Sequence, residues 1–122
     1  MLSKAEEKIM KILWKQNGAF MKDILDVLPE PKPAKTTVST LLKRMTDKEM
    51  IKYETIGNAR KYIPTVAKKN YFGKKFKEFK NTFFNNSSTQ FASFFTKETD
   101  LSISELEEIQ KLINEEIKKK KQ

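Results

Sequence analysis

Apolar residues between positions 35 and 47 recur at the spacing i, i+3, i+4 and i+7, which places them on one side of a helix. They are Val38, Leu41, Leu42 and Met45. The opposite side carries hydroxyl groups and cations, with no acid before Asp47. Such side chains can bind phosphates and base edges, although a solvated helix face is also commonly polar. The candidate DNA-binding residues on this helix are Lys35, Thr36, Thr37, Ser39, Thr40, Lys43 and Arg44.

The residues after this helix predict a two-stranded hairpin. Apolar and polar residues alternate from 51 to 56, and a second run, 60–63, ends at Pro64. Residues 57–59 between the runs can form the turn, because Gly57 is free to adopt a positive φ. Arg60 and Lys61 are then expected at or just after the tip, as further DNA-binding residues. A basic hairpin directly after a polar-faced helix is typical of a winged helix, which is a helix-turn-helix with an added β-ribbon.

The N-terminal residues supply the other helices of such a fold. Ser3 and Glu6 fit a capping box, so a helix is expected from Lys4 to a stop near Gly18. A second helix over about 21–27 is followed by three prolines, which prevent its continuation and lead into the polar-faced helix. The predicted fold class is therefore mainly α with a small β wing, and residues 1–66 form a winged helix-turn-helix DNA-binding domain.

The C-terminal part, residues 67–122, is predicted to be a helical dimerisation region. Eight of the nine phenylalanines lie between Phe72 and Phe95, more aromatic surface than one short helix can bury. Helices are expected over about 68–83 and 89–95, with a loop at 96–99 and a capped helix from Ser102 onward. A second copy of the chain would cover this surface, whereas a monomer would fold these helices back on the winged helix. The candidate dimerisation residues are Phe72, Phe76, Phe79, Phe83, Phe91, Phe94, Phe95, Leu106, Ile109 and Ile113.

The charge balance adds a polyanionic partner to this picture. The chain of 122 residues carries 25 basic and 16 acidic residues, a formal net charge of +9. Residues 32–61 hold eight basic and three acidic residues, so over half of the excess lies on the polar-faced helix and the hairpin. Double-stranded DNA is the expected partner. The lysine tail, 118–121, is expected to be a solvated, disordered end.

The missing residue types narrow the function further. The chain has no Cys and no His, which removes thiolate metal sites and the commonest general base. No clustered acids or phosphate-binding glycine loop are evident, so no enzyme activity, metal or cofactor is expected. No apolar run is long enough for membrane insertion, and the N-terminus does not resemble a secretory signal. A cytoplasmic location is therefore expected.

The chain resembles the penicillinase repressor (BlaI/MecI/CopY) family of bacterial transcriptional repressors over nearly its full length. The resemblance rests on Thr36-Thr37-Val38, Leu41-Leu42, Arg44, Lys48, Gly57, residues 62–64 and Leu13-Trp14. Two positions depart from the family pattern. Glu49 stands where the family usually has Gly, and the Gly-Arg of the wing is spread over Gly57-Asn58-Ala59-Arg60.

Two-fold pairing through the C-terminal helices would make the operator a palindrome. The resemblance implies a dimer that occupies this operator until an upstream signal releases it. It also implies a short third strand, for which Ala19-Phe20 is the candidate. In one branch of the family a membrane sensor is associated with proteolytic cutting of the repressor beside a Phe. The matching positions here are Ser93 and Phe94, with Ser93 in place of the family's Asn. The alternatives are a winged helix that binds protein or RNA, and an enzyme built on Lys or carboxylates.

Overall fold

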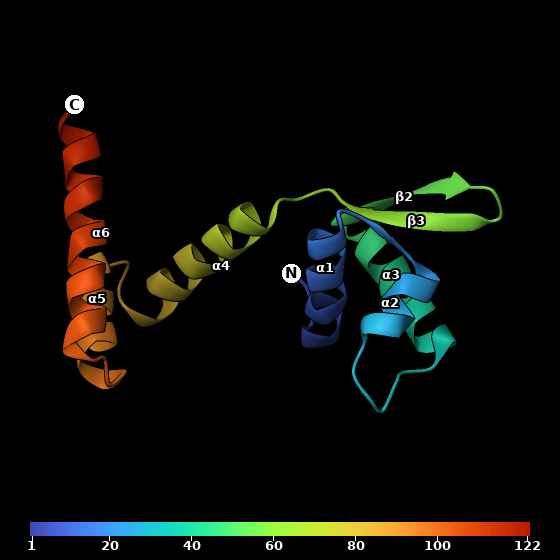
Figure 1. Ribbon diagram of the computed structural model, residues 1–122, viewed down its shortest axis with the longest axis horizontal. Helices are drawn as coiled ribbons and strands as arrows, with labels where there is room; N and C mark the ends of the chain where they lie inside the picture. The colour runs from blue at the N-terminus through green and yellow to red at the C-terminus, as the bar shows by residue number, and fades with distance from the viewer. The chain divides into compact units, whose positions relative to one another are not determined.

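The structure, a computed structural model, describes residues 1–122 and divides them into two compact units, Met1–Gly73 and Lys74–Gln122. The chain forms six helices and three strands, and the whole sheet and the first three helices belong to the first unit (Figure 1). This mainly helical fold with one small antiparallel sheet confirms the predicted winged helix. The elements are α1 (Lys4–Gln16), β1 (Ala19–Phe20), α2 (Met21–Val27), α3 (Lys35–Asp47), β2 (Ile51–Ile56), β3 (Ala59–Pro64), α4 (Lys68–Phe83), α5 (Ser88–Glu98) and α6 (Ile103–Lys121).

Local hydrogen bonds fix both ends of α1. The Ser3 hydroxyl accepts a bond of 3.2 Å from the Glu6 N–H, and the Glu6 carboxylate accepts one of 2.7 Å from the Ser3 N–H. This reciprocal pair is the predicted capping box. The helix is capped at its C-terminal end by Asn17, whose φ of 58° is left-handed, and the next residue, Gly18, has a φ of 104°. A Cβ on Gly18 would lie 3.3 Å from the carbonyl oxygen of Tyr62, so glycine also permits the close approach of β3.

The sheet has the strand order β1-β3-β2, and β3 is antiparallel to both neighbours. Ala19 pairs with Tyr62 in β3, which confirms the short third strand. The hairpin turn consists of Gly57 and Asn58 alone, one residue shorter than the predicted turn, because Ala59 already pairs with Ile56. Gly57 has a φ of 63° as the first turn residue, the position at which a type II′ hairpin turn requires glycine.

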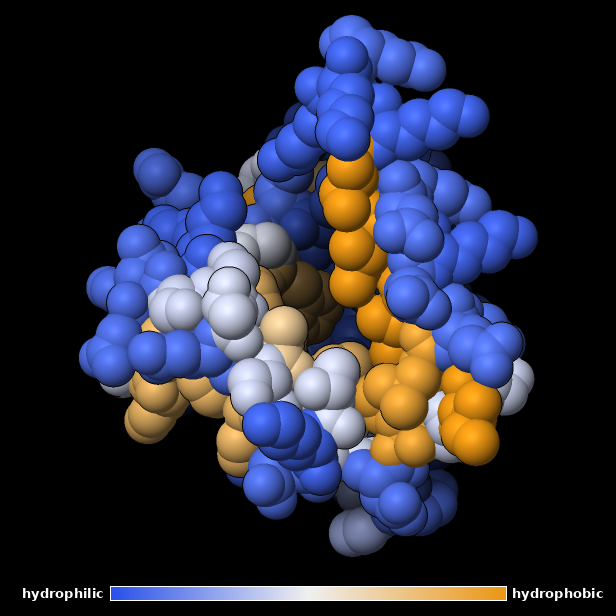
Figure 2. Space-filling model, turned by 90° about the vertical axis from the view of Figure 1, so that its left-hand side faces the viewer, coloured by the Kyte–Doolittle hydropathy of each residue, from blue (hydrophilic) through white to orange (hydrophobic).

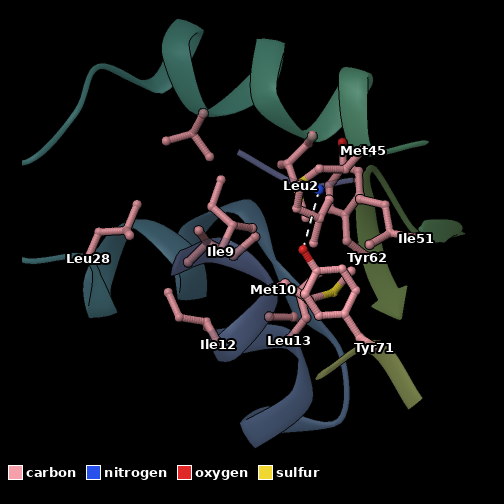
Figure 3. Packing of buried hydrophobic residues seen from close by; sticks show 14 residues of the cluster. Leu2, Ile9, Met10, Ile12, Leu13, Leu28, Met45, Ile51, Tyr62 and Tyr71 are labelled. Atoms are coloured by element: carbon pink, nitrogen blue, oxygen red, sulfur yellow. Dashed lines mark hydrogen bonds between the residues drawn. The ribbon is translucent and has the colours of Figure 1, made fainter. Parts of the chain in front are cut away.

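The core of the first unit is formed by the apolar stripes of α1, α2 and α3 and by the inner side of the sheet. Ile9, Met10 and Leu13 of α1 are almost fully buried, and so are Val38, Leu42 and Met45 of α3. Figure 3 shows these α1 residues packed below α3, with Ile51 and Tyr62 closing the side toward the sheet. The predicted apolar stripe of α3 is therefore buried, and its polar side is left exposed.

The first turn of α4 is bound to this core through aromatic side chains. The ring centroids of Tyr71 and Phe72 each lie 5.8 Å from that of Trp14. The Trp14 indole N–H donates a hydrogen bond of 2.8 Å to the carbonyl oxygen of Val66. The Tyr71 hydroxyl accepts from the backbone N–H of Leu2 at 3.3 Å, which is the dashed line in Figure 3, and donates to the Glu7 carboxylate. These contacts fix the chain segment that follows β3.

An ion pair with a buried carboxylate joins α1 to the C-terminal end of α3. Glu6 is 1% exposed, and its Oε1 lies 2.7 Å from the Lys48 ammonium. Lys48 also donates to the carbonyl oxygen of Met1 at 3.0 Å. Burial by itself raises the pKa of the Glu6 carboxyl, but hydrogen bonds from Lys48 and Ser3 and the charge of Lys48 outweigh it and hold the pKa below its ordinary value.

The second unit departs from the sequence-based expectations at two places. The loop predicted at 96–99 is wrong, because α5 continues to Glu98, where the Thr96 hydroxyl donates to the carbonyl oxygen of Ala92 at 2.8 Å. The disordered lysine tail is also wrong, since α6 extends to Lys121. Four lysines in the last turn complement the negative end of the helix dipole, and glutamates near the first turn complement the positive end.

Candidate nucleic-acid interface

The polar side of α3 is available to a ligand along the whole helix. All seven of the predicted contact residues on α3 are exposed. Successive residues turn by about 100° around an α-helix, so Thr36, Ser39, Thr40 and Lys43 share one side, whereas Thr37 and Arg44 lie further round. The Thr40 hydroxyl donates to the carbonyl oxygen of Thr36 at 3.0 Å. In this arrangement its lone pairs remain free to accept a hydrogen bond from a base amino group.

The hairpin contributes an arginine whose position is fixed by an aromatic ring. The Arg60 guanidinium carbon lies 4.3 Å from the centroid of the Tyr53 ring on the neighbouring strand. The Tyr53 ring in turn lies 5.9 Å from that of Tyr62. Arg60 and Lys61 are adjacent on β3, so their side chains leave opposite faces of the sheet. Arg60 shares the face of Tyr62, whereas the half-buried Lys61 extends its aliphatic chain over Gly18.

Arg60 and the polar side of α3 line the same groove. This groove, of about 370 Å³, lies between α3 and the hairpin. Its floor includes the rings of Tyr53 and Tyr62, and its one acid, Asp47, is paired with Lys43 at 3.2 Å. The structure thus brings Ser39, Thr40, Lys43 and Arg60 together. Lys61 does not join them, and Thr37 lines a different hollow, beside α1 and the proline-rich loop.

A second groove, of about 620 Å³, lies on the other side of Arg60, between α2, the start of α3 and the hairpin turn. Lys35 and Arg60 line it together with Lys22 and Asn58, which the sequence analysis did not single out. Its only acid is Asp26. No side chain caps the N-terminus of α3, and its first turn holds no acid, so the positive end of the helix dipole is uncompensated there. This groove suits an anionic group such as a backbone phosphate.

Three residues that line the two grooves, Tyr53, Lys22 and Asn58, were not predicted from the sequence. The first could have been found from the hairpin register, since Tyr53 pairs with Tyr62 and is therefore diagonal to Arg60 on one face of the sheet. Lys22 and Asn58 gave no such signal, because their proximity to Lys35 depends on how α2 packs against the sheet.

Positive charge is concentrated in the first unit. Residues 1–73 hold 15 basic and 8 acidic residues, whereas residues 74–122 hold 10 and 8. The first unit therefore carries a net charge of +7 and the second a net charge of +2. A polyanion is attracted mainly to the unit that contains the two grooves.

The candidate dimerisation residues fall into both units. Phe72 packs against Trp14 in the first unit. The others lie in the second unit, where Phe76 and Phe91 form an edge-to-face pair with centroids 4.8 Å apart. Phe91, Phe95 and Ile109 are half-buried there. Six candidates keep more than a third of their surface exposed, namely Phe76, Phe79, Phe83, Phe94, Leu106 and Ile113.

Comparison with known proteins shows the family of the chain. The profile of the penicillinase repressor family matches residues 2–115. The chain belongs to the penicillinase repressor family. The Penicillinase repressor of Bacillus licheniformis is 25% identical to it over 122 residues, which cover 99% of this chain and 95% of the relative. Membership of this family, together with the fold, makes the chain a winged-helix transcriptional repressor.

Two solved structures are also similar to this repressor. One, titled "CopR Repressor Structure", is 33% identical, has a TM-score of 0.47, and aligns over 54% of this chain and 97% of its own. The other, the BpsR protein of Bordetella bronchiseptica, is 16% identical, has a TM-score of 0.49, and aligns over 93% of this chain and 74% of its own. None of the repressor's six helices combines the length and the apolar character needed to cross a bilayer.

Proposed function

We propose that this repressor binds a palindromic double-stranded DNA operator as a homodimer in the bacterial cytoplasm. The observation that carries the proposal is the shared groove, in which the exposed hydroxyls and Lys43 of α3 face Arg60 of the hairpin. A helix with short polar side chains can enter the major groove of DNA, while a basic wing contacts the adjacent backbone or minor groove. The two subunits of a symmetric dimer would read two half-sites related by a two-fold axis.

The residues have separate roles in this proposal. Thr36, Ser39, Thr40 and Lys43 face base edges, because they share the outermost side of α3. Lys35 and Thr37 in the first turn of α3, and Arg44 further along, contact phosphates. Of the two hairpin cations, Arg60 reaches the DNA on the side of α3. Lys61, on the opposite face of the sheet, would contact only the flanking backbone.

The first experiment selects operators from random duplex DNA and then measures binding of variants at several salt concentrations. Arg60→Ala should weaken binding to all sequences alike and reduce the salt slope by about one, because one phosphate contact is lost. Thr40→Ala should instead change the preference at one base pair. Lys15→Ala is the matched control, since it removes an exposed cation of the same unit from the end of α1. Loss of binding in this control equal to that of Arg60→Ala would refute the assigned interface.

Duplex specificity separates this proposal from its main alternative. A winged helix used for RNA or protein contact would bind single strands as well as the duplex, or would bind with little salt dependence. The repressor is expected to prefer the selected duplex over single-stranded DNA or RNA of the same sequence by at least about a thousandfold, the low end of specific over non-specific binding. Equal affinity for these ligands would contradict operator recognition.

The homodimer is supported by the exposed phenylalanines of the second unit. Phe83 is 69% exposed and Phe94 is 52% exposed, although Phe is among the residues most often buried. Sedimentation of the wild-type chain should give a dimer, and Phe83→Ser should shift the equilibrium toward monomer and weaken operator binding in parallel. A wild-type chain that sediments as a monomer at operator-binding concentrations would refute the dimer.

The membrane sensor system stays a proposal that rests on resemblance to the family. Ser93 and Phe94 lie in the middle of α5, and both are exposed. Proteases cleave exposed, flexible segments most readily, so a cut at this bond requires α5 to unwind locally. Mass spectrometry of the repressor after induction should show fragments ending at Ser93, and an intact chain would exclude this route of release.

A further inference from the structure

A stripe of exposed apolar side chains runs along α6. Ile103 is 76% exposed, Ile113 is 54% exposed and Ile117 is 47% exposed. Figure 2 shows a column of hydrophobic side chains, in orange, with hydrophilic side chains, in blue, beside it. The stripe consists of four apolar residues and one glutamine, separated by alternating steps of three and four: Ile103, Leu106, Gln110, Ile113 and Ile117. A narrow stripe with this spacing is the seam of a coiled coil, in which the members alternate between a and d positions, so its natural occupant is another helix.

The charges of α6 are segregated along its length. Three of its acids, Glu105, Glu107 and Glu108, lie near the first turn, and four lysines, 118–121, occupy the last turn. If two copies of α6 ran parallel, the lysines of both would lie side by side, with Lys120 at a d position facing its own counterpart. If the copies ran antiparallel, the lysines of each would lie beside the acids of the other. Charge complementarity therefore favours an antiparallel second copy.

The spacing also fixes the register of such a pair. In an antiparallel coiled coil an a residue packs against a d residue of the other helix. The best match places Leu106 against the partner's Ile117 and Gln110 against the partner's Ile113. The two-fold axis then crosses α6 between residues 111 and 112, and Glu107 faces the partner's Lys121 at the edge of the seam. Leu106, Ile113 and Ile117 each pack against a stripe residue of the partner. Ile103 packs against the aliphatic part of the partner's Lys120.

We propose that α6 pairs with the α6 of a second copy in this antiparallel register. The inference rests on the homodimer proposed above and adds to it the direction and the alignment of one helix pair. Such a pair is isologous, because the same surface of each copy meets itself across the two-fold axis. The exposed phenylalanines of the second unit would extend the same interface.

The absence of cysteine permits a direct test with spin labels on the full-length chain. Ser104, Lys111 and Lys118 are seven residues apart and point in about the same direction from α6. Each is replaced singly by Cys, labelled, and the distance between the two labels of the dimer is measured by pulsed electron paramagnetic resonance. With a rise of about 1.5 Å per residue, the axial separation should be about 22 Å at 104, about 2 Å at 111 and about 20 Å at 118.

Each other result has a defined meaning. Three equal distances would show a parallel pair, and a minimum at 104 or 118 would show a different register, so either would overturn the inference. A dimer in gel filtration with long distances at all three sites would overturn the α6 pair but leave the homodimer intact. A monomer in gel filtration without dipolar coupling would refute the homodimer itself.

Charge reversal provides a second, independent test. Glu107→Lys and Lys121→Glu should each raise the dimer dissociation constant by about fivefold, because each places two like-charge pairs at the edges of the seam. The double variant should regain wild-type affinity, since it restores opposite charges. Glu108→Lys is the matched control, on the outer side of α6, and should leave the dimer unchanged. In a parallel pair Lys121 would face the partner's Glu116, so rescue by Glu116→Lys in place of Glu107→Lys would contradict the antiparallel register.

Discussion

Replacement of Lys48 by Met is expected to destabilise the winged helix through Glu6, a residue of a different helix. The change removes the ammonium that lies 2.7 Å from the Glu6 carboxylate, while Glu6 remains 1% exposed. The Ser3 N–H stays as a donor to Oε1, but Oε2 has no hydrogen-bond partner. An uncompensated charge is then left in the interior, and Met cannot replace the bond to the carbonyl oxygen of Met1.

The magnitude follows from the burial of the two partners. Breaking a fully buried ion pair by removing one member costs about 3–5 kcal/mol. The Lys48 side chain is 39% exposed, so in the variant water can partly solvate the Glu6 carboxylate, which reduces the cost of breaking the pair. We therefore expect a loss of about 2 kcal/mol in the free energy of unfolding, which lowers the melting temperature of a unit of this size by roughly 8–16 °C.

The pH dependence separates this cause from a general packing defect. In the wild type the folded-state pKa of Glu6 lies below its ordinary value, so its contribution to stability is present above the unfolded pKa and is lost as the pH falls through the folded pKa. In Lys48→Met the loss of the ammonium moves the folded pKa of Glu6 upward relative to wild type, so protonation relieves the unpaired charge at a higher pH. The deficit relative to wild type should therefore be largest at neutral pH and should shrink on acidification.

Urea unfolding at several pH values measures this deficit. Glu6→Gln combined with Lys48→Met is the matched control, since it removes the buried charge while keeping the shape of the side chain. The double variant should be more stable than Lys48→Met alone at neutral pH. A deficit that does not change with pH, or a double variant less stable than Lys48→Met, would refute the role assigned to the Glu6 charge.

Three further substitutions test local features of the first unit by thermal unfolding. Gly18→Ala should cost about 1–3 kcal/mol, because the backbone φ is positive there and the new Cβ would crowd β3, and an unchanged melting temperature would contradict this. Lys32→Met should cost roughly 1 kcal/mol, because Met cannot replace the hydrogen bonds that the Lys32 ammonium donates to the carbonyl oxygens of Leu25 and Leu28 at the end of α2. Lys15→Met is the control and should have little effect. Trp14→Phe should cost about 1–2 kcal/mol, because the bond to the Val66 carbonyl is lost, and an equally stable variant would show that this bond contributes nothing.

Features that depend on neighbouring residues were predicted well from the sequence. The capping boxes at Ser3 and Ser102 formed as expected, because each needs only residues three apart. The period of the apolar residues correctly placed the buried side of α3. The end of α5 was missed, because Thr96 satisfies its hydroxyl within the helix and so allows α5 to continue where its composition suggested a loop.

The sequence by itself determined the order of elements and the basic character of α3 and the hairpin, since helical and strand periods are properties of local geometry. Only the tertiary structure decided which cations act together. Arg60 and Lys61 are neighbours in the chain, yet the pairing of β3 with β2 directs Arg60 to Tyr53 and the groove beside α3, while Lys61 extends over Gly18. The reason is that strand register and helix packing depend on contacts between residues far apart in sequence, which no local pattern specifies.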